Sequence, residues 1–219
     1  MKKFVKNAFV KLFVPCYNLI YRRTNRQKHI TFISQNCVGG VLYHMLGIAF
    51  SSPTINMFIE NEHFVKLAEN PEHYFSMDAK PYEEHHVDSV EGSDDVLTYP
   101  IIRVDDILLC CQHYNSCSEA VEAWNKRRLR VNLKNMYAIC CSWNLGERED
   151  LVKRISNLPY PSIVFTTEDF KYPNCVKLTK AIYVKDVRGA VKPNLTSFKG
   201  IFGKRYFVDE FDFVKWINR

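Results

Sequence analysis

Short apolar runs alternate with amphipathic stretches along most of this chain. Runs rich in Ile, Val, Phe and Cys predict buried strands at His29–Ser34, Pro100–Val104, Ile107–Cys111, Met136–Ser142 and Ile163–Thr166. Apolar residues at helical spacing predict helices at Val41–Leu46, Asn61–Asn70, Glu147–Ser156 and Asp209–Ile217. Because strands that alternate with helices form parallel sheets, we predict an α/β fold: a three-layer α/β/α, Rossmann-like arrangement whose mostly parallel sheet includes an antiparallel hairpin.

The stretch Ile107–Asn132 links one of these strands to a further predicted helix. The polar residues from His113 onward follow its apolar run, and Ser116 with Glu119 three residues later is typical of a capping box at a helix start. The basic residues of the last turns, which complement the helix dipole, are Lys126, Arg127, Arg128 and Arg130. Open α/β sheets bind ligands just outside the carboxyl ends of their strands. We therefore take His113 and the Trp124–Arg130 cluster as candidates for chemistry.

Two acidic stretches have both a structural and a metal-binding interpretation. Asp105-Asp106 lies between two apolar runs, and we interpret it as the turn of a β-hairpin rather than as a ligand pair for Mg²⁺ or Mn²⁺. The segment Asp78–Tyr99 mixes histidines with carboxylates, but their spacing matches no recognised metal site. We expect this segment to be a solvated edge or loop.

Charge is distributed unevenly along the chain. The sequence has 30 Lys and Arg against 24 Asp and Glu, a net charge of +6, and eight of the basic residues lie in residues 1–28, which contain no acid. The remainder therefore has 22 basic residues against 24 acids, and such a body disfavours nucleic-acid binding. We expect a basic N-terminal segment at 1–28 and a single α/β domain at 29–219.

The N-terminal segment has the pattern of an amphipathic helix that ends near Pro15. Phe4, Phe9, Leu12 and Phe13 fall on one half of a helical wheel, and lysines fall on the other half. Such a helix lies in the interface of an anionic membrane, and the lack of acids favours this over packing on the body. The interspersed lysines disfavour a signal peptide, and no apolar run of about 20 residues predicts a transmembrane helix.

The eight cysteines include no CxxC pair, so a structural zinc site has little support. The adjacent pairs Cys110-Cys111 and Cys140-Cys141 lie in predicted strands, where successive side chains point to opposite faces. We expect the cysteines to be buried free thiols, as in a reducing compartment.

A strand, a Gly-containing turn and a helix start follow one another from Phe32 to Leu46. Backbone N–H groups at Gly39 and Gly40, with the amide of Asn36, could bind an anion such as a phosphate. The two glycines match neither the dinucleotide fingerprint nor the P-loop. A tight turn that needs positive φ is an equal alternative.

With these motifs in place, the chain resembles a bacterial family known as domain of unknown function 1919, whose members are often described as exopolysaccharide biosynthesis proteins. The resemblance runs from about Ile30 to Arg205. It rests on FISQNCVGG at Phe32–Gly40, SPT at Ser52–Thr54, HY at His113-Tyr114 and WNKRRLRVN at Trp124–Asn132. The family usually has an aromatic residue where this chain has Val38. The resemblance implies an α/β domain encoded near surface-polysaccharide genes.

The motifs and the resemblance together predict a glycosyltransferase that uses a nucleotide-activated sugar and a lipid-linked glycan acceptor. It would act in the cytoplasm, peripherally on the inner face of the bacterial plasma membrane. His113 would be the general base, because histidine side chains titrate near neutral pH. The residues assigned to the substrate are Asn36, Gly39, Gly40, Thr54, Tyr114, Trp124, Arg127, Arg128 and Arg130. We assign no cofactor or metal ligand, with Mg²⁺ or Mn²⁺ left as an alternative.

Two other functions stay open. A non-catalytic component that assembles or regulates the polysaccharide machinery needs only the amphipathic segment and an interaction surface. A transferase of acyl or phosphate-linked substituents would be an enzyme with a different donor. Selective binding of uridine diphosphate would favour glycosyl transfer over both.

Overall fold

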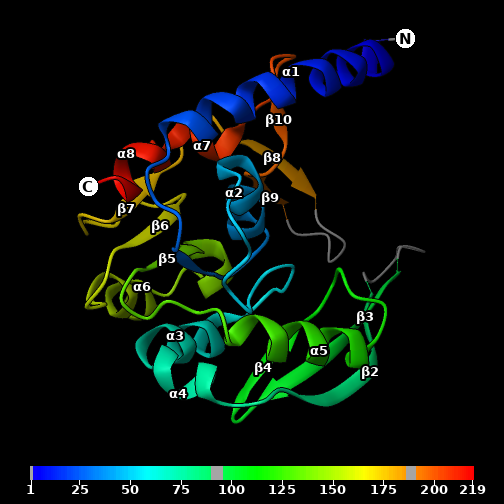
Figure 1. The fold of residues 1–219 in the computed structure, drawn as a ribbon, viewed down its shortest axis with the longest axis vertical. Coiled ribbons are helices and arrows are strands. Elements are labelled where there is room, and N and C mark those ends of the chain that lie inside the picture. Colours follow the sequence, from blue (N-terminus) through cyan, green and yellow to red (C-terminus); the bar gives the residue numbers. More distant parts are fainter. Residues whose placement is uncertain (1, 90–95, 186–190) are drawn as a thin grey trace.

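A four-stranded parallel sheet lies at the centre of the computed structural model, which describes residues 2–89, 96–185 and 191–219 (Figure 1). Its strands in spatial order are β1 (Thr31–Ser34), β5 (Met136–Cys141), β6 (Ser162–Thr166) and β7 (Cys175–Lys177). Nearly every residue of β1, β5 and β6 is buried, as expected when apolar runs form a sheet that is covered on both sides. These three strands are confirmed predictions.

Helices cover both faces of this sheet. Successive side chains of a strand point to opposite faces, so Ile33 of β1 joins one hydrophobic cluster and Phe32 joins another. The adjacent Cys140 and Cys141 of β5 divide between the clusters in the same way. The helices on the Ile33 face are α3 (Asn61–Glu69) and α6 (Glu149–Ser156), and those on the Phe32 face are α2 (Val38–Leu46), α7 (Tyr206–Glu210) and α8 (Phe213–Ile217).

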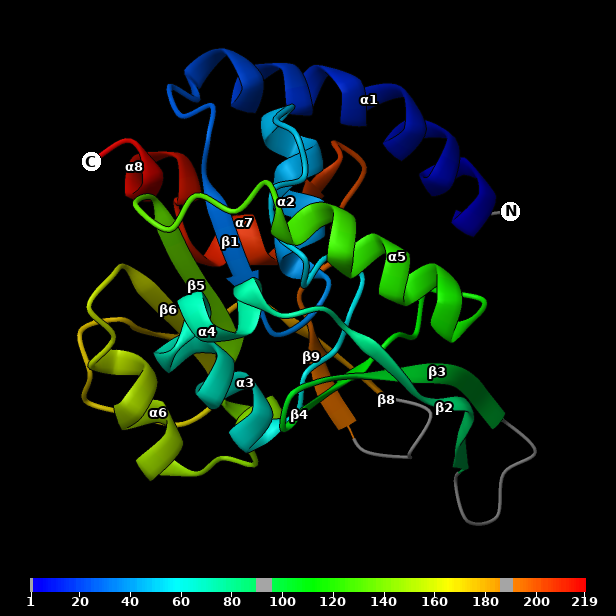
Figure 2. The same ribbon diagram turned by 60° about the horizontal axis from the view of Figure 1, so that its bottom comes forward.

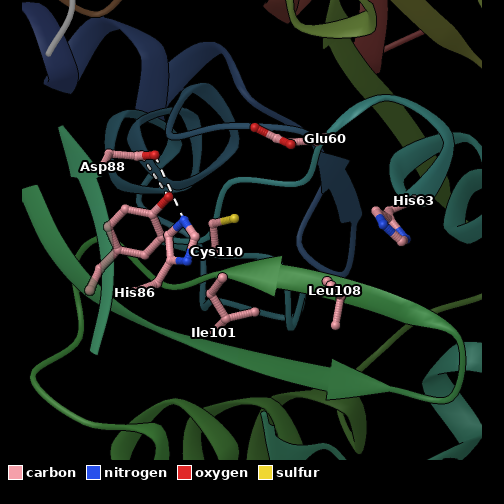
Figure 3. Close-up of a pocket in the computed structure, with 8 residues that line it drawn as sticks. Glu60, His63, His86, Asp88, Ile101, Leu108 and Cys110 are labelled. Carbon is pink, nitrogen blue, oxygen red and sulfur yellow. Dashed lines mark hydrogen bonds and ion pairs between the residues drawn. The ribbon is translucent and has the colours of Figure 1, made fainter. Parts of the chain in front are cut away.

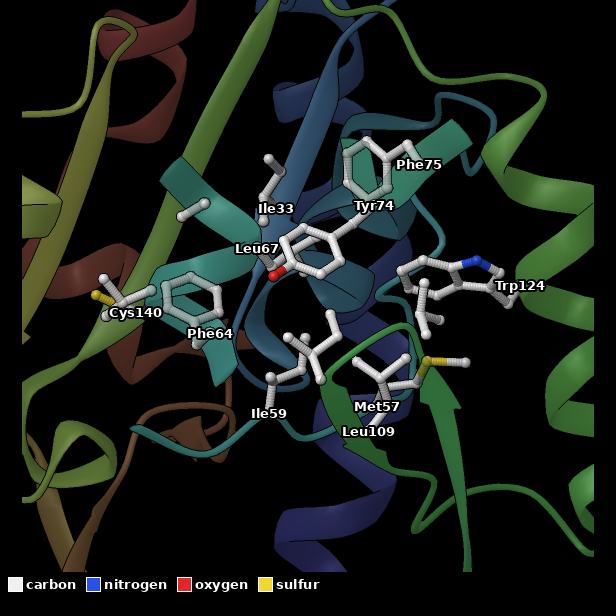
Figure 4. Close-up of a cluster of buried hydrophobic side chains, with 14 of the residues drawn as sticks. Ile33, Met57, Ile59, Phe64, Leu67, Tyr74, Phe75, Leu109, Trp124 and Cys140 are labelled. Carbon is white, nitrogen blue, oxygen red and sulfur yellow. The ribbon is translucent and has the colours of Figure 1, made fainter. Parts of the chain in front are cut away.

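The cluster on the Ile33 face also joins the parallel sheet to a second sheet. Figure 4 shows Phe64 of α3 beside the strands that carry Ile33 and Cys140, with Leu109 and Trp124 in the same cluster. All five side chains are buried. Because burying one such Leu or Phe side chain stabilises a fold by roughly 1.5–3 kcal/mol, this shared core fixes the two sheets together.

The second sheet is antiparallel, and it contains the predicted hairpin. Val104 pairs with Ile107 across Asp105-Asp106, so the turn is confirmed, and Asp105 adopts a positive φ of 51°. The strand that begins at Ile107 therefore pairs with the strand that ends at Val104 and does not belong to the parallel sheet. The elements of this layer are β2 (Lys80–Ser89), β3 (Val96–Val104), β4 (Ile107–Cys110) and the helix α5 (Cys117–Arg128), which packs on β2 and β3 (Figure 2).

The fold class is thus mixed α/β, with a four-stranded parallel sheet and separate antiparallel sheets. The Rossmann-like three-layer arrangement stays a prediction. The charged segment Asp78–Tyr99 contributes β2, an edge strand whose side chains are mostly exposed, in agreement with a solvated edge. Its residues 90–95 lie outside the described ranges.

The C-terminal region consists of short elements. The predicted single helix at Asp209–Ile217 is wrong, because Phe211 is extended with a φ of −147° and Asp212 caps a new helix by accepting the N–H of Lys215 at 3.0 Å. The remaining short elements are α4 (Pro71–Ser76), the 3₁₀ turn η1 (Ser142–Leu145), β8 (Ile182–Lys185), β9 (Val191–Asn194), β10 (Phe198–Lys199) and β11 (Lys204–Arg205).

The N-terminal helix α1 (Lys2–Thr24) continues through Pro15, so its predicted end is wrong. A proline inside a helix removes one backbone hydrogen bond. Here packing outweighs that loss, because Val10 is buried and Tyr17 and Tyr21 pack against the Phe32-face cluster. Within the described residues, no helix combines the length and the apolarity that crossing a membrane would require.

Candidate functional site

The structure brings His113 into contact with a residue that the sequence analysis did not select. Nε2 of His113 lies 3.1 Å from Sγ of Cys37. Cys37 is half-buried at the start of α2, directly beyond the carboxyl end of β1, and His113 is exposed on the connection between β4 and α5. A thiol beside an imidazole is a nucleophile with an adjacent base.

The residues around Cys37 hold it at the helix start through local hydrogen bonds. Oδ1 of Asn36 accepts the N–H of Val38 at 3.1 Å, and Oγ of Ser34 accepts the N–H of Gly39 at 3.0 Å. A Cβ on Gly39 would lie 2.5 Å from Cβ of Ser34, so only glycine lets the helix approach the strand this closely. Of the two N–H groups in the predicted anion site, that of Gly39 is therefore already bonded within the protein and gives an anion site there no support.

Gln35 fixes the ends of two neighbouring parallel strands. Its Oε1 accepts the N–H of Cys141 at 3.1 Å, and its Nε2 donates to the carbonyl of Asn144 at 3.1 Å. Nδ2 of Asn36 lies 3.2 Å from Sγ of Cys141. These contacts tie the loop before Cys37 to the end of β5 and to η1. The position of Cys37 is thus set by side chains that are themselves buried or half-buried.

Cys37 opens onto a cavity of about 250 Å³. Its lining is largely apolar and comes from the Cys37 loop, from η1 and from the β9 region. Val38, Trp143 and Leu195 contribute apolar surface, and Asn144 contributes polar groups. Such a cavity beside a nucleophile has room for a small group bearing a carbonyl.

A two-residue segment holds His113 in register with Cys37. Phe58 exchanges two backbone hydrogen bonds with Cys110 of β4, at 2.8 and 2.9 Å. The next residue, Ile59, donates its N–H to the carbonyl of Gln35 at 3.0 Å. The antiparallel sheet that delivers His113 is therefore bonded, through adjacent residues, to the loop that delivers Cys37.

Burial raises the pKa of the Cys37 thiol above its ordinary value of 9.0. The thiol is therefore protonated at neutral pH, and its reaction as a nucleophile requires a base to remove the proton during attack. His113 is the group in hydrogen-bond contact that can do so.

Tyr114, Arg127 and Thr54, which the sequence assigned to substrate, have partners inside the protein. Nη1 of Arg127 donates to the hydroxyl of Tyr114 and, at 3.2 Å, to the carbonyl of Ile55, which also accepts the Tyr114 hydroxyl at 2.9 Å. Oγ1 of Thr54 accepts the N–H of Ser34 at 3.2 Å. These contacts fix the segment after Ser52 against β1 and α5. Direct contact of the three residues with substrate stays a prediction.

The rest of the predicted cluster lies away from the Cys37 cavity lining. Trp124 is fully buried, and its Nε1 donates to the carbonyl of Met77 at 3.1 Å. Arg128 binds Asp78 and the carbonyl of Ser76. Arg130 is exposed beyond the end of α5. Gly40 packs near Ile55, where an added Cβ would meet a side-chain carbon at 3.4 Å.

A second cavity, of about 350 Å³, lies against the antiparallel sheet (Figure 3). The hydroxyl of Tyr99 donates to Asp88 at 2.7 Å, and Nε2 of His86 lies 3.7 Å from the same carboxylate. Figure 3 shows Glu60 and His63 on other sides of this cavity. Because Glu60 directly follows Ile59, the cavity borders the segment that is bonded to the Cys37 loop.

The acidic pair Asp105-Asp106 binds side chains of the protein. Asp106 accepts from Lys66 at 2.6 Å and from Tyr74 at 2.8 Å, and these hydrogen bonds lower its pKa. Asp105 lies 2.9 Å from Nε2 of His73. In the described part of the chain, His, Cys, Asp and Glu side chains form no group of three or more that could hold a metal ion.

Cys37 was not predicted as a site residue, because all the cysteines were expected to be buried thiols. That expectation is confirmed for Cys110, Cys111, Cys117, Cys140 and Cys141, whereas Cys16 is exposed and Cys37 and Cys175 are half-buried. The missed signal was positional. Cys37 lies between a buried strand and a Gly-Gly helix start, where a side chain faces outward from the sheet end.

Comparisons with known proteins place the chain in a family. A family model described as domain of unknown function (DUF1919) matches residues 9–218. A relative from Haemophilus influenzae, described as an uncharacterized protein, is 28% identical over 206 residues, which cover 92% of this chain and 90% of the relative. Neither description names an activity, and the link to exopolysaccharide synthesis stays a prediction. Because the family model covers nearly the whole chain, this protein belongs to the DUF1919 family.

Proposed function

We propose that this protein is a transferase that carries an acyl group as a thioester on Cys37. The observation that supports this most directly is the 3.1 Å contact between Sγ of Cys37 and Nε2 of His113 beside a small, mainly apolar cavity. A thiol next to a base is what nucleophilic acyl transfer requires. Acyl transfer was one alternative from the sequence, and this geometry makes it the preferred function.

In the first half-reaction, Cys37 would attack the carbonyl carbon of an acyl thioester donor. His113 takes the proton from Sγ as the new carbon–sulfur bond forms. The bond between the carbonyl carbon and the donor sulfur then breaks, and the protonated imidazole returns the proton to that leaving thiolate. The products are the free donor thiol and an acyl group on Cys37, so atoms and charge balance.

In the second half-reaction, a hydroxyl of the acceptor would attack this thioester. His113 removes the hydroxyl proton, the carbon–oxygen bond forms, and the carbon–sulfur bond to Cys37 breaks. The proton then returns to Sγ. Asn144, whose backbone carbonyl accepts a hydrogen bond from Gln35, lines the cavity and would donate its side-chain amide to the developing oxyanion.

The second cavity suits a hydroxyl-rich acceptor such as a glycan. Carboxylates from Glu60 and Asp88 accept hydrogen bonds from hydroxyl groups, and the partly exposed ring of His86 offers a flat surface for a sugar ring. This cavity borders the segment bonded to the Cys37 loop. A surface-glycan acceptor would fit the polysaccharide role that the sequence resemblance predicts.

Intact-protein mass spectrometry tests the acyl-enzyme directly. The protein is mixed with acetyl-coenzyme A or p-nitrophenyl acetate in the absence of an acceptor. We expect the mass of one acetyl group to appear and to map to Cys37. A Cys16→Ser background removes the exposed thiol that could react without a base.

Variants separate the dyad from general thiol reactivity. Cys37→Ser should abolish the adduct, and His113→Gln should slow its formation by roughly 10²–10⁴, as expected for loss of a general base. The matched controls are Cys175→Ser, a half-buried thiol elsewhere, and His85→Gln, an exposed histidine on β2. An adduct on Cys37 that forms equally fast in His113→Gln would contradict the proposed mechanism.

Glycosyl transfer remains a second candidate, because His113 is exposed at the sheet end and is positioned to deprotonate a sugar hydroxyl as well. Its support is weaker, since Arg127 and Arg128 already bind groups of the protein. Calorimetric titration with uridine diphosphate distinguishes the two. Selective binding of uridine diphosphate without any acyl adduct would favour glycosyl transfer. If the protein neither binds uridine diphosphate nor forms an acyl adduct, a non-catalytic role in polysaccharide assembly would be favoured.

A further inference from the structure

The face of α1 that points away from the protein is apolar. Phe9, Leu12, Leu19 and Ile20 are 43, 66, 45 and 60% exposed. We call these four residues the outer strip. At about 100° per residue, their positions fall within an arc of about 100°, on one side of the helix. The opposite side, with Val10, packs on the body, so the outer strip is distinct from the packing face.

Rows of exposed, large apolar side chains on a protein surface usually mark a site of interaction. In Figure 1, α1 runs along one edge of the molecule, at the opposite end from β2 and β3. A helix of 23 residues is about 35 Å long at 1.5 Å per residue. The outer strip, from Phe9 to Ile20, occupies about 17 Å of that length and can contact a flat surface there.

A basic groove adjoins the C-terminal end of the strip. It lies between α1 and α8, and Ile20 of the outer strip forms part of its wall. The cations of the basic groove are Arg23, Arg26, Lys215 and Arg219. Asp212 is the one carboxylate side chain in the lining. Among the described residues, none of these four cationic side chains has an ion pair shorter than 4.0 Å.

We propose that the outer strip and the basic groove together dock on an anionic membrane surface. The strip would insert between lipid chains near the headgroups, and the groove would bind the phosphates of anionic lipids. Charge complementarity selects this occupant. α1 contains six lysines and arginines and no acid, so the surface complementary to it is negatively charged and, against the outer strip, apolar, as an anionic membrane is.

The loop between β10 and β11 widens the apolar surface. The ring of Phe202, which is 63% exposed, lies 5.4 Å from the ring of Phe13 in an edge-to-face arrangement. Ile201 beside it is 37% exposed. The docking surface thus combines the N-terminal helix with a C-terminal hairpin. This differs from the sequence-based expectation, in which the N-terminal segment acted alone.

Vesicle co-sedimentation of the full chain tests the proposal. The vesicles contain phosphatidylcholine alone or phosphatidylcholine with phosphatidylglycerol, at low and at high salt. We expect binding to the anionic vesicles and weaker binding at high salt, because salt screens the attraction between the cations of the basic groove and the lipid phosphates. Leu12→Asp with Ile20→Asp should lower the partition coefficient at least tenfold, and Arg23→Ala with Arg26→Ala should reduce the salt-sensitive part of the binding.

Matched controls show whether the effect belongs to this surface. Leu129→Asp with Leu133→Asp changes two leucines that are 77 and 41% exposed elsewhere, and Lys134→Ala with Lys153→Ala removes two exposed cations. Both controls should bind vesicles like the parent protein. Circular dichroism confirms that each variant is folded.

Three results would overturn the proposal. The first is equal binding to neutral and anionic vesicles. The second is unchanged binding by the Leu12→Asp, Ile20→Asp variant. The third is self-association in analytical ultracentrifugation that this variant abolishes, with no vesicle binding, which would identify the strip as an interface between two copies. None of these measurements depends on the chemistry of Cys37.

Discussion

Nε2 of His113 and Sγ of Cys37 lie 3.1 Å apart, although 76 residues separate them in the sequence. Cys37 follows a strand of the parallel sheet, and His113 follows a strand of the antiparallel sheet. The pair therefore exists only when the two sheets are packed together. Its reactivity is a direct measure of the native arrangement.

The pH dependence of Cys37 alkylation tests the state of the thiol. Because burial raises the pKa of Cys37 above 9.0, the rate with iodoacetamide in the Cys16→Ser background should keep rising with pH beyond that value. His113→Gln should slow alkylation near neutral pH. A rate that is already maximal at pH 7 would show a preformed thiolate and would contradict the predicted direction of the shift.

Gly39→Ala tests the close packing of α2 on β1. The added Cβ would lie 2.5 Å from Cβ of Ser34, so the helix start must move. We expect a loss of about 1–3 kcal/mol of unfolding free energy in urea denaturation, together with slower alkylation of Cys37. Gly40→Ala is the matched control, because its Cβ would make an ordinary contact with Ile55 at 3.4 Å. Equal effects of the two substitutions would refute the packing argument.

Arg127→Ala distinguishes a structural role from donor binding. The substitution removes the guanidinium that donates to the Tyr114 hydroxyl and to the Ile55 carbonyl. We expect roughly 1–3 kcal/mol of destabilisation by thermal or urea unfolding. Arg130→Ala, at an exposed position, should have little effect. If Arg127 serves a nucleotide instead, binding of uridine diphosphate should weaken while the unfolding midpoint stays unchanged.

Asp209 should make stability depend on pH in the acid range. Hydrogen bonds from Lys199 and Lys204 lower its pKa from 3.8 to about 2. Since the folded-state pKa is depressed, the stabilisation is complete above pH 3.8 and is lost as the pH falls through about 2. Asp209→Asn should therefore be less stable than the parent at neutral pH, and the difference should shrink toward pH 2.

Thermal unfolding from pH 7 to pH 2 measures this difference. Asp169→Asn is the control, because the ion pair of Asp169 with Lys177 involves a carboxylate that is 81% exposed. Exposed pairs contribute little to stability, so this variant should follow the parent at every pH. If Asp209→Asn is less stable than the parent by the same amount at every pH, the contacts with Lys199 and Lys204 stabilise the fold through packing and not through the charge of Asp209.

The elements that the sequence predicted correctly are those with local causes. The strands at Met136 and Ser162 follow from apolar runs, and the turn at Asp105-Asp106 follows from two such runs with two polar residues between them. Similarly, Ser116 caps α5 by accepting the N–H of Glu119 at 3.1 Å. The carboxylate of Glu119 binds the N–H of Asn115 rather than that of Ser116, so the capping box forms only in part.

The errors and omissions have tertiary causes. No local pattern states which sheet a hairpin joins, and the predicted hairpin of β3 and β4 lies in an antiparallel sheet with β2, separate from the parallel sheet. α1 passes Pro15 because of packing on the body, which a helical wheel does not include. His113 was predicted from its position at a strand end, and its catalytic role stays a prediction. Its partner Cys37 required knowledge of how two sheets meet, and that depends on the shared core around Ile33 and Leu109.

Phe58 and Ile59 connect the two sheets. Phe58 bonds to Cys110 in the antiparallel sheet, and Ile59 bonds to Gln35, which directly follows β1 of the parallel sheet. Any fluctuation that separates the sheets must break the amide hydrogen bonds of Phe58, Ile59 or Cys110. Hydrogen–deuterium exchange at these three amides therefore reports the opening that would part His113 from Cys37. Exchange there sets an upper limit on how long the reactive pair persists between openings. A ligand that bridges both sheets would lengthen that lifetime without touching either side chain of the pair.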